Sequence, residues 1–431
     1  MRPSSSPATP GDRLHRRNSA LASIVDMQHV LAPTRPRLAG LDAARGLAVL
    51  GMFAAHVGAA DRLFDWTDPS SWPDLVNGRS SVLFALCAGV SLVLLTTGPR
   101  ADPETTGRAT TGRPGGGLLR DRRHVLARAA VLLAIGALLT LVPGGVLVIL
   151  PTYAVLFVAA LPFLRLRLRW VVLATALSLG VGPVLALVGQ AVVEMSGSGI
   201  ADLLFVGYPA VSWFGVVLAG VLVARLGLDR APLLRRMLVV GTAMAVVGYG
   251  GGALLGSALG VVGPVGMLVP ATSGGGAGPV SKIVPSGGPD VVQLRPEFPP
   301  FPQIQWERLL DVTPHSGSSF ELVGALGIAL AVLAALCLVA VRLASVLLPL
   351  RAVGRLALTL YCGHVLAIGA WFAAGNPDPV PALHGWFPFT VLAVVAVVTA
   401  LLVDRSGRRG PLEALTRRAS RALDDPRPAT A

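Results

Sequence analysis

Long apolar stretches recur along the chain, separated by short segments rich in arginine, glycine and proline. A helix that crosses a membrane needs about 20 mostly apolar residues. Ten stretches approach or exceed this length: 39–60, 80–97, 124–142, 145–163, 170–193, 203–224, 236–260, 321–341, 353–374 and 386–403. The pattern therefore predicts an all-α protein, a polytopic bundle of about ten transmembrane helices.

The basic residues are unevenly shared between alternate connections of this bundle. With a cytoplasmic N-terminus, the inner segments hold thirty of the 36 Lys and Arg residues, the outer segments hold five, and Arg45 lies within the first span. Cytoplasmic loops carry the excess of Lys and Arg in membrane proteins. The count predicts a multi-pass protein of the inner cell membrane with both termini in the cytoplasm.

The same pattern divides the chain into a membrane domain and two tails. Residues 1–36 are polar, basic and rich in Pro and Ser, which predicts a disordered cytoplasmic tail. The membrane domain covers 37–403, and 404–431 form a cytoplasmic C-terminal tail. Within the membrane domain, 261–319 is too long and too rich in Gly and Pro for a simple turn, so we expect an extracytoplasmic loop there.

Composition excludes several classes of protein. The chain is 53% hydrophobic and only 14% charged, against about 25% charged residues in soluble domains. Its net charge of +13 does not indicate nucleic-acid binding, because the arginine clusters lack interleaved aromatic residues. All three cysteines, Cys87, Cys337 and Cys362, lie in apolar runs, where a thiol behaves as a small hydrophobe. We expect chemistry without a metal and without a bound cofactor.

Candidate chemistry concentrates in the first span, which contains Asp42, Arg45 and His56. Charged groups inside a membrane are costly and mostly face a protein interior or a polar cavity. Arg45 and His56 are eleven positions apart, almost three turns at ~100° per residue, so an uninterrupted helix carries both on one face, ~16 Å apart. We expect His56 to act as a general base and Arg45 to hold an acyl donor. The alternatives are a histidine at the headgroups and a structural ion pair between Asp42 and Arg45.

Four further residues are candidates for substrate binding. Arg79 opens the second span on the outer side, and His315 precedes another span on that side. Tyr153 and His364 lie in apolar spans. Each has a structural alternative: a headgroup anchor for Arg79, a helix start capped by Ser318 or Ser319 near His315, an interfacial aromatic for Tyr153 and a core histidine for His364.

The segment RLAGLDAARG, followed by His56, resembles the start of integral-membrane acyltransferases. Acyltransferase family 3 has an Arg, ten residues and then a His in its first span, as do Arg45 and His56 here. The overall resemblance is closer to bacterial proteins with a heparan-alpha-glucosaminide N-acetyltransferase-like domain. It covers about residues 37–403, through NGRSSVLFALCAGVSL, LPTYAVLFVAALPF, YPAVSWFGVVLAG, TPHSGSSFELVG and VGRLALTLYCGH.

This resemblance implies a membrane acyltransferase. The donor is acyl-CoA, commonly acetyl-CoA, a co-substrate taken from the cytoplasm, and the acceptor is a sugar hydroxyl or amine beyond the lipid bilayer, which points to a cell-envelope glycan or glycolipid. In the glucosaminide N-acetyltransferase an acyl-carrying His precedes a Trp in the first outer loop. The matching stretch here, DPSSW at 68–72, has no His, so direct transfer with His56 as base is favoured.

Two other classes of function fit the same pattern. A transporter or flippase of a lipid-linked or small anionic solute would use the polar stripe as a path. A structural membrane partner would use it for packing alone.

Overall fold

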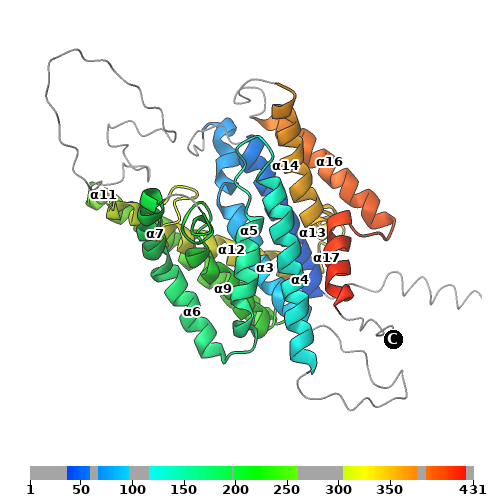
Figure 1. Ribbon diagram of the computed structural model, residues 1–431, viewed down its shortest axis with the longest axis horizontal. Helices are drawn as coiled ribbons and strands as arrows, with labels where there is room; N and C mark the ends of the chain where they lie inside the picture. The colour runs from blue at the N-terminus through cyan, green and yellow to red at the C-terminus, as the bar shows by residue number, and fades with distance from the viewer. Residues whose placement is uncertain are drawn as a thin grey trace, which may run out of the picture.

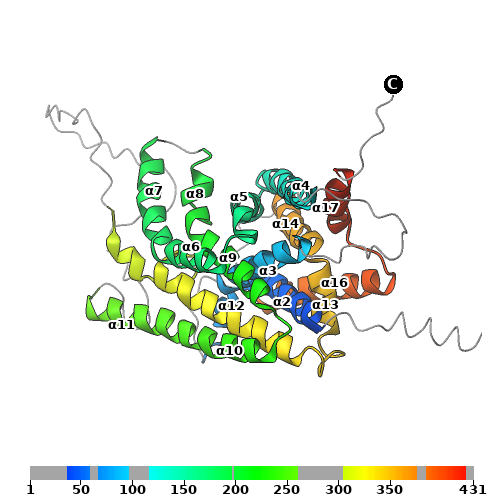
Figure 2. The ribbon, with the colours of Figure 1, turned by 90° about the horizontal axis from the view of Figure 1, so that it is seen from below.

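The computed structural model describes residues 36–58, 67–96, 116–196, 199–260, 304–375 and 385–423. In these ranges the chain is helical apart from short connections and contains no strand, which confirms the all-α prediction (Figures 1 and 2). The predicted tail at 1–36 lies outside the described residues except for Pro36, as does most of the loop at 261–319.

The helices follow the predicted apolar stretches closely. They are α2 (Pro36–Phe53), η1 (Ala54–Gly58), η2 (Pro69–Val76), α3 (Arg79–Thr96), α4 (Gly116–Leu139), α5 (Leu150–Ala160), η4 (Pro162–Leu164), α6 (Leu168–Gly180), α7 (Gly182–Ser196), α8 (Asp202–Phe205), α9 (Ala210–Leu226), α10 (Ala231–Ala245), η5 (Val246–Gly250), α11 (Gly251–Ala258), η6 (Trp306–Leu310), α12 (Ser319–Val339), α13 (Leu348–Arg355), α14 (Ala357–Ala373), α16 (Trp386–Arg405) and α17 (Pro411–Ala422).

By length and apolar composition, four helical segments of the described chain can cross a membrane: Asp74–Thr96, Ala231–Ala258, Ser319–Val339 and Trp386–Arg405. The number rises to six if each of two bent helix pairs is one span. The chain is therefore a membrane protein, and each of the ten predicted ranges overlaps one helix or a consecutive run of helices.

The structure divides two of the predicted spans. The range 170–193 contains α6 and α7, which bend by 48° at Val181, between Gly180 and Gly182. The range 353–374 contains the end of α13 and all of α14, which bend by 79° at Leu356. Pro183 follows the first break, and Gly and Pro both weaken a continuous helix.

The centre of the bundle is formed by α2, α3 and α9, which lie between α10 and α12 on one side and α4, α14 and α16 on the other (Figure 2). Helices α3 and α9 are apolar on all faces and mostly buried, as expected of helices surrounded by other helices. The core is one large cluster that extends from α2 to α16.

Helix α2 packs against α13 with their backbones in contact. A methyl group added at Gly46 would overlap the Leu350 carbonyl, and one added at Gly354 would overlap the Asp42 carbonyl. Small residues allow this close approach between helices in membranes. The contact holds the end of α13 beside Asp42 and Arg45.

Part of the predicted C-terminal tail is a packed helix. Helix α17 lies against α4 and α14 (Figure 1). The Glu413 carboxylate accepts hydrogen bonds from the backbone N–H (3.0 Å) and the hydroxyl (2.5 Å) of Thr359. Thr359 lies in the first turn of α14, where an acidic group stabilises a helix.

The contact of α2 with α13 predicts the effect of one methyl group. Gly354→Ala should lower the melting temperature in detergent, because overpacking costs about 1–3 kcal/mol. Gly363→Ala, in α14 with open space around it, is the control and should be neutral or slightly stabilising. Equal melting temperatures for the two variants would show that α2 and α13 do not need this contact.

Candidate functional site

Asp42 and Arg45 form an ion pair in α2, the structural alternative that the sequence offers for these residues. The Arg45 guanidinium donates to Asp42 Oδ1 at 2.7 Å and to Ser91 Oγ of α3 at 2.6 Å. Both charged side chains are about one-fifth exposed, because they line a cavity. This geometry is compatible both with a purely structural ion pair and with a role for Arg45 in ligand binding at the cavity wall.

This inner cavity has a volume of about 380 Å³ and lies between α2, α3, α4, α5 and the junction of α13 with α14. Its apolar lining includes Phe84, Leu132, Tyr153 and Phe157, and its polar lining includes Arg45. A mostly apolar pocket with a few polar groups is typical of small-molecule sites. The Tyr153 hydroxyl donates to the Ser81 carbonyl at 3.4 Å, so its ring forms part of a fixed wall.

A second, larger cavity of about 810 Å³ adjoins the first, and we call it the basic vestibule. The two share Leu95, Arg128, Arg355 and Glu413. Six arginines line the vestibule against two acids, Asp404 and Glu413: Arg128, Arg355, Arg408, Arg409, Arg417 and Arg421. Such a concentration of positive charge attracts anionic ligands.

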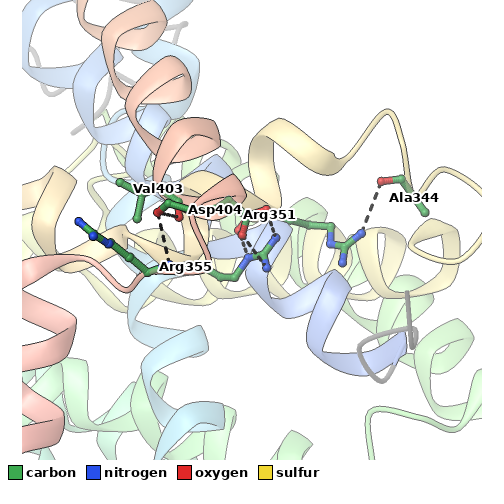
Figure 3. A network of polar contacts seen from close by, with 7 residues as sticks. Ala344, Arg351, Arg355, Val403 and Asp404 are labelled. Atoms are coloured by element: carbon green, nitrogen blue, oxygen red, sulfur yellow. Dashed lines mark hydrogen bonds and ion pairs between the residues drawn. The ribbon is translucent and has the colours of Figure 1, made fainter. Parts of the chain in front are cut away.

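The two acids of the vestibule are engaged by the protein itself. Arg355 pairs with Asp404 at 2.8 Å and joins α13 to α16 (Figure 3). Glu413 is held by Thr359. Burial, followed by the neighbouring guanidinium groups of Arg409 and Arg421, lowers the pKa of Arg417 below its usual value. An anion in the vestibule would relieve this repulsion.

Arg128 stands at the junction of the two cavities. Its Nε is buried and has no hydrogen-bond partner among the described residues. Buried donors are nearly always paired, and an unpaired one calls for an explanation such as a missing ligand. Arg128 therefore offers an unused donor at the point where the two cavities join.

His56 lies directly after α2, eleven residues after Arg45. The α-helix ends at Phe53, and His56 is on a π-helical turn, Ala54–Gly58. The predicted alignment with Arg45 assumed an uninterrupted α-helix, and the π turn rotates His56 away from that position. Its Nδ1 lies 2.9 Å from Nε2 of His364 in α14.

His364 is almost fully buried, with 2% of its surface exposed. It packs against the rings of Phe53, at 4.6 Å, and Tyr361, at 5.1 Å. The expected core environment is therefore present, together with a polar contact to His56 that the sequence did not indicate. Neither histidine lines the two cavities described above.

A second contact between distant parts of the sequence lies near His56. His315 Nε2 and Asn77 Oδ1 are 3.0 Å apart, and the His315 ring packs edge-on against Tyr208. His315 is exposed and has a positive φ of 65°, which is uncommon for residues other than glycine. The predicted helix cap is present, because Ser318 accepts the Glu321 N–H at 3.0 Å.

Arg79 is largely engaged by its own surroundings. It donates to the Asp74 and Leu75 carbonyls at 3.1 and 3.2 Å, and its guanidinium lies 4.8 Å from the centre of the Tyr249 ring. These contacts hold η2 against the start of α3, which supports an anchoring role for Arg79.

The start of α16 packs beside the π turn that contains His56. Trp386 Nε1 donates to the Pro69 carbonyl at 3.0 Å, and the Gly385 N–H donates to the Val57 carbonyl at 2.9 Å. Connections that the charge count places outside the cell thus meet around His56, while those it places inside meet at the vestibule. Within the described ranges, no three His, Cys, Asp or Glu side chains gather as a metal site.

Two families match this chain. The first is described as "Heparan-alpha-glucosaminide N-acetyltransferase, catalytic" and matches residues 37–249. The second is described as "Protein of unknown function (DUF418)" and matches residues 304–422. The protein is a heparan-alpha-glucosaminide N-acetyltransferase-like membrane protein. No curated protein matches it.

The candidate site is built where the two matched regions meet. His56 and Asn77 belong to the first, and their partners His364 and His315 belong to the second. The vestibule likewise combines Arg128 of the first region with α17 of the second. Both regions are therefore needed for one site.

The ion pair in α2 predicts a non-additive stability effect. Asp42→Asn should lower the melting temperature more than Asp42→Asn combined with Arg45→Gln, because the single change leaves a partly buried charge unpaired. Ser91→Ala removes the hydrogen bond from Arg45 and the one to the Cys87 carbonyl and leaves the charges balanced. It is the control and should cost about 1–2 kcal/mol. If the single and double variants melt together, Arg45 is solvated by the cavity and does not depend on Asp42.

Proposed function

We propose that this protein is an acyltransferase of the inner cell membrane. It moves an acyl group, acetyl in the simplest case, from cytoplasmic acyl-CoA to a hydroxyl or amine of a sugar on a cell-envelope glycan or glycolipid. The similarity of residues 37–249 to an N-acetyltransferase catalytic region supports the reaction class. The proposed binding site for acyl-CoA is based mainly on Arg128, whose Nε–H has no hydrogen-bond partner among the described residues at the junction of two adjoining cavities.

The two cavities fit the two chemical parts of an acyl-CoA. Its phosphates are anionic, and arginine binds phosphate with paired, charge-assisted hydrogen bonds. The vestibule offers six arginines for them. The inner cavity is mostly apolar and suits the uncharged arm that carries the thioester, with Arg45 on its wall.

Transfer across the membrane requires the donor and acceptor to enter from opposite ends. In the proposed topology the chain crosses the membrane about ten times and both termini are cytoplasmic. The positive charge of the vestibule supports a cytoplasmic position for that end. The acceptor then approaches His56 from outside, past His315, with Arg79 and His364 near this end. Tyr153 lies in the wall of the inner cavity, on the donor side. The acyl end of the donor extends beyond the inner cavity to reach His56, which does not line that cavity.

His56 acts as the general base in this proposal. One ring nitrogen takes the proton of the acceptor hydroxyl or amine as its oxygen or nitrogen attacks the thioester carbonyl. The carbon–sulfur bond then breaks, and the departing thiolate takes that proton from His56. Acyl-CoA and acceptor become acylated acceptor and free thiol, and the protein is unchanged.

A transporter or flippase of an anionic, lipid-linked solute is the second candidate. The basic vestibule and the ion pair inside the membrane would also suit such a solute. The two functions differ in one observable, the formation of a covalent acyl product.

The first test follows labelled acetyl groups. Purified protein in liposomes, given labelled acetyl-CoA and envelope extract, should form acetylated product detectable by mass spectrometry. His56→Ala should lower the rate by about 10²–10⁴-fold, the usual contribution of a general base, while His15→Ala, ahead of the first helix, should not. No product with the wild type, together with solute uptake into vesicles, would establish transport instead.

The second test concerns the donor site. Arg128→Gln should raise the KM for acetyl-CoA about tenfold or more with little change in kcat, as expected when uniform binding is lost. Its melting temperature without ligand should not fall, because the Nε that it removes is unpaired. Arg169→Gln, on α6 and stacked on Trp170, is the control. An unchanged KM for Arg128→Gln would place the donor elsewhere.

A further inference from the structure

The contact between His56 and His364 restricts where the protons can be. Nδ1 of His56 and Nε2 of His364 are 2.9 Å apart, and their ring planes are nearly parallel, 9° apart. A hydrogen bond between two neutral imidazoles contains one proton, because one nitrogen must donate and the other accept. Either His56 donates through Nδ1, or His364 donates through Nε2.

The surroundings of His364 favour the first arrangement. Its Nδ1 is buried and has no hydrogen bond of normal geometry within the described part of the chain. The polar groups that act on this ring from its own helix are the carbonyls of Leu360 and Tyr361, one turn back. Carbonyl oxygens attract an N–H and repel a lone pair, so the proton of His364 belongs on Nδ1. Its Nε2 is then an acceptor, and His56 donates through Nδ1.

We propose that His364 is a positioning residue that fixes the tautomer of His56. With its Nδ1 proton held by His364, a neutral His56 has its lone pair on Nε2, the nitrogen that turns away from the pair. That lone pair is what a general base needs. In the opposite tautomer Nε2 carries the proton and cannot accept another.

This inference rests on the proposed function, and it specifies the path of the proton. The acceptor proton moves to Nε2 of His56 as the new carbon–oxygen or carbon–nitrogen bond forms. His56 becomes positively charged while Nδ1–H remains bound to His364. The proton on Nε2 then leaves with the thiolate as the carbon–sulfur bond breaks. His364 neither gains nor loses a proton.

The packing around His364 keeps this arrangement rigid. Phe53, directly before the π turn, and Tyr361, one turn back in α14, contact the ring. The Tyr361 hydroxyl in turn accepts the Ile149 N–H at 3.4 Å. A group that orients a catalytic histidine in the correct tautomer is worth orders of magnitude in rate in other enzymes.

Two substitutions of similar size separate positioning from packing. In His364→Gln the side-chain oxygen can still accept the His56 Nδ1–H, whereas His364→Met fills the space without a strong acceptor. We expect Met to lower kcat about 10²-fold or more, with KM for both substrates within about threefold of wild type. Gln should restore most of that loss. If His364 only packs the core, the kcat of His364→Met should instead exceed that of His364→Gln, because Met suits an apolar site better than Gln.

Nitrogen-15 NMR of histidine-labelled protein provides a readout that does not depend on activity. In the wild type, the unprotonated nitrogen of His56 should be Nε2, and in His364→Met this preference should be lost. Equal kcat for both variants, or a wild-type His56 with its proton on Nε2, would overturn the inference. A wild type with the expected tautomer and no acyl transfer would refute the proposed function and leave the pairing intact.

Discussion

The backbone contact between α2 and α13 is the constraint on which the candidate site depends. Gly46 and Gly354 allow the two helices to touch, and both ends of the site follow from that contact. It holds Asp42 and Arg45 beside Arg355 at the inner cavity. Because α14 follows α13 after a single bend of 79°, it also directs α14 along α2 toward the π turn, where His364 meets His56. A larger side chain at either glycine would separate the helices and with them the two halves of the site.

The two charged side chains of α2, Asp42 and Arg45, are paired with each other and lie at a cavity. Arg45 is paired with Asp42, bonded to Ser91 and open to the inner cavity. Placing an ionisable group inside a membrane costs free energy, so this arrangement indicates a functional role. At the other end the side chains of His56 and His364 contact each other, and an uncharged imidazole costs less to bury than a charge. The order from Arg45 in α2 to His56 in η1 is the order in which the proposed donor and acceptor would meet.

Helix α14 links the two ends mechanically. Its first turn is held by Glu413 of α17, a helix of the basic vestibule. Its next turns contain Tyr361 and His364. The vestibule and the histidine pair therefore share one rigid element, and α17 belongs to the folded domain although the sequence pattern assigned it to a tail.

The sequence by itself determined the helical class and the position of each apolar helix. It also offered, as structural alternatives, the ion pair of Asp42 with Arg45 and a helix cap at Ser318 or Ser319, and the structure contains the pair and the cap at Ser318. These features depend on composition or on residues within one or two turns, so local chemistry decides them. Only the tertiary structure paired His56 with His364, 308 positions away. It also placed His56 on a π turn and bent two predicted spans. It packed α17 against the bundle, which gathers arginines that the sequence showed only as a topology signal. The amphipathic pattern of residues 411–422 was the one local sign of that helix. The remaining features depend on how distant helices pack, and in a bundle whose helices are apolar on most faces, periodicity does not specify the neighbours.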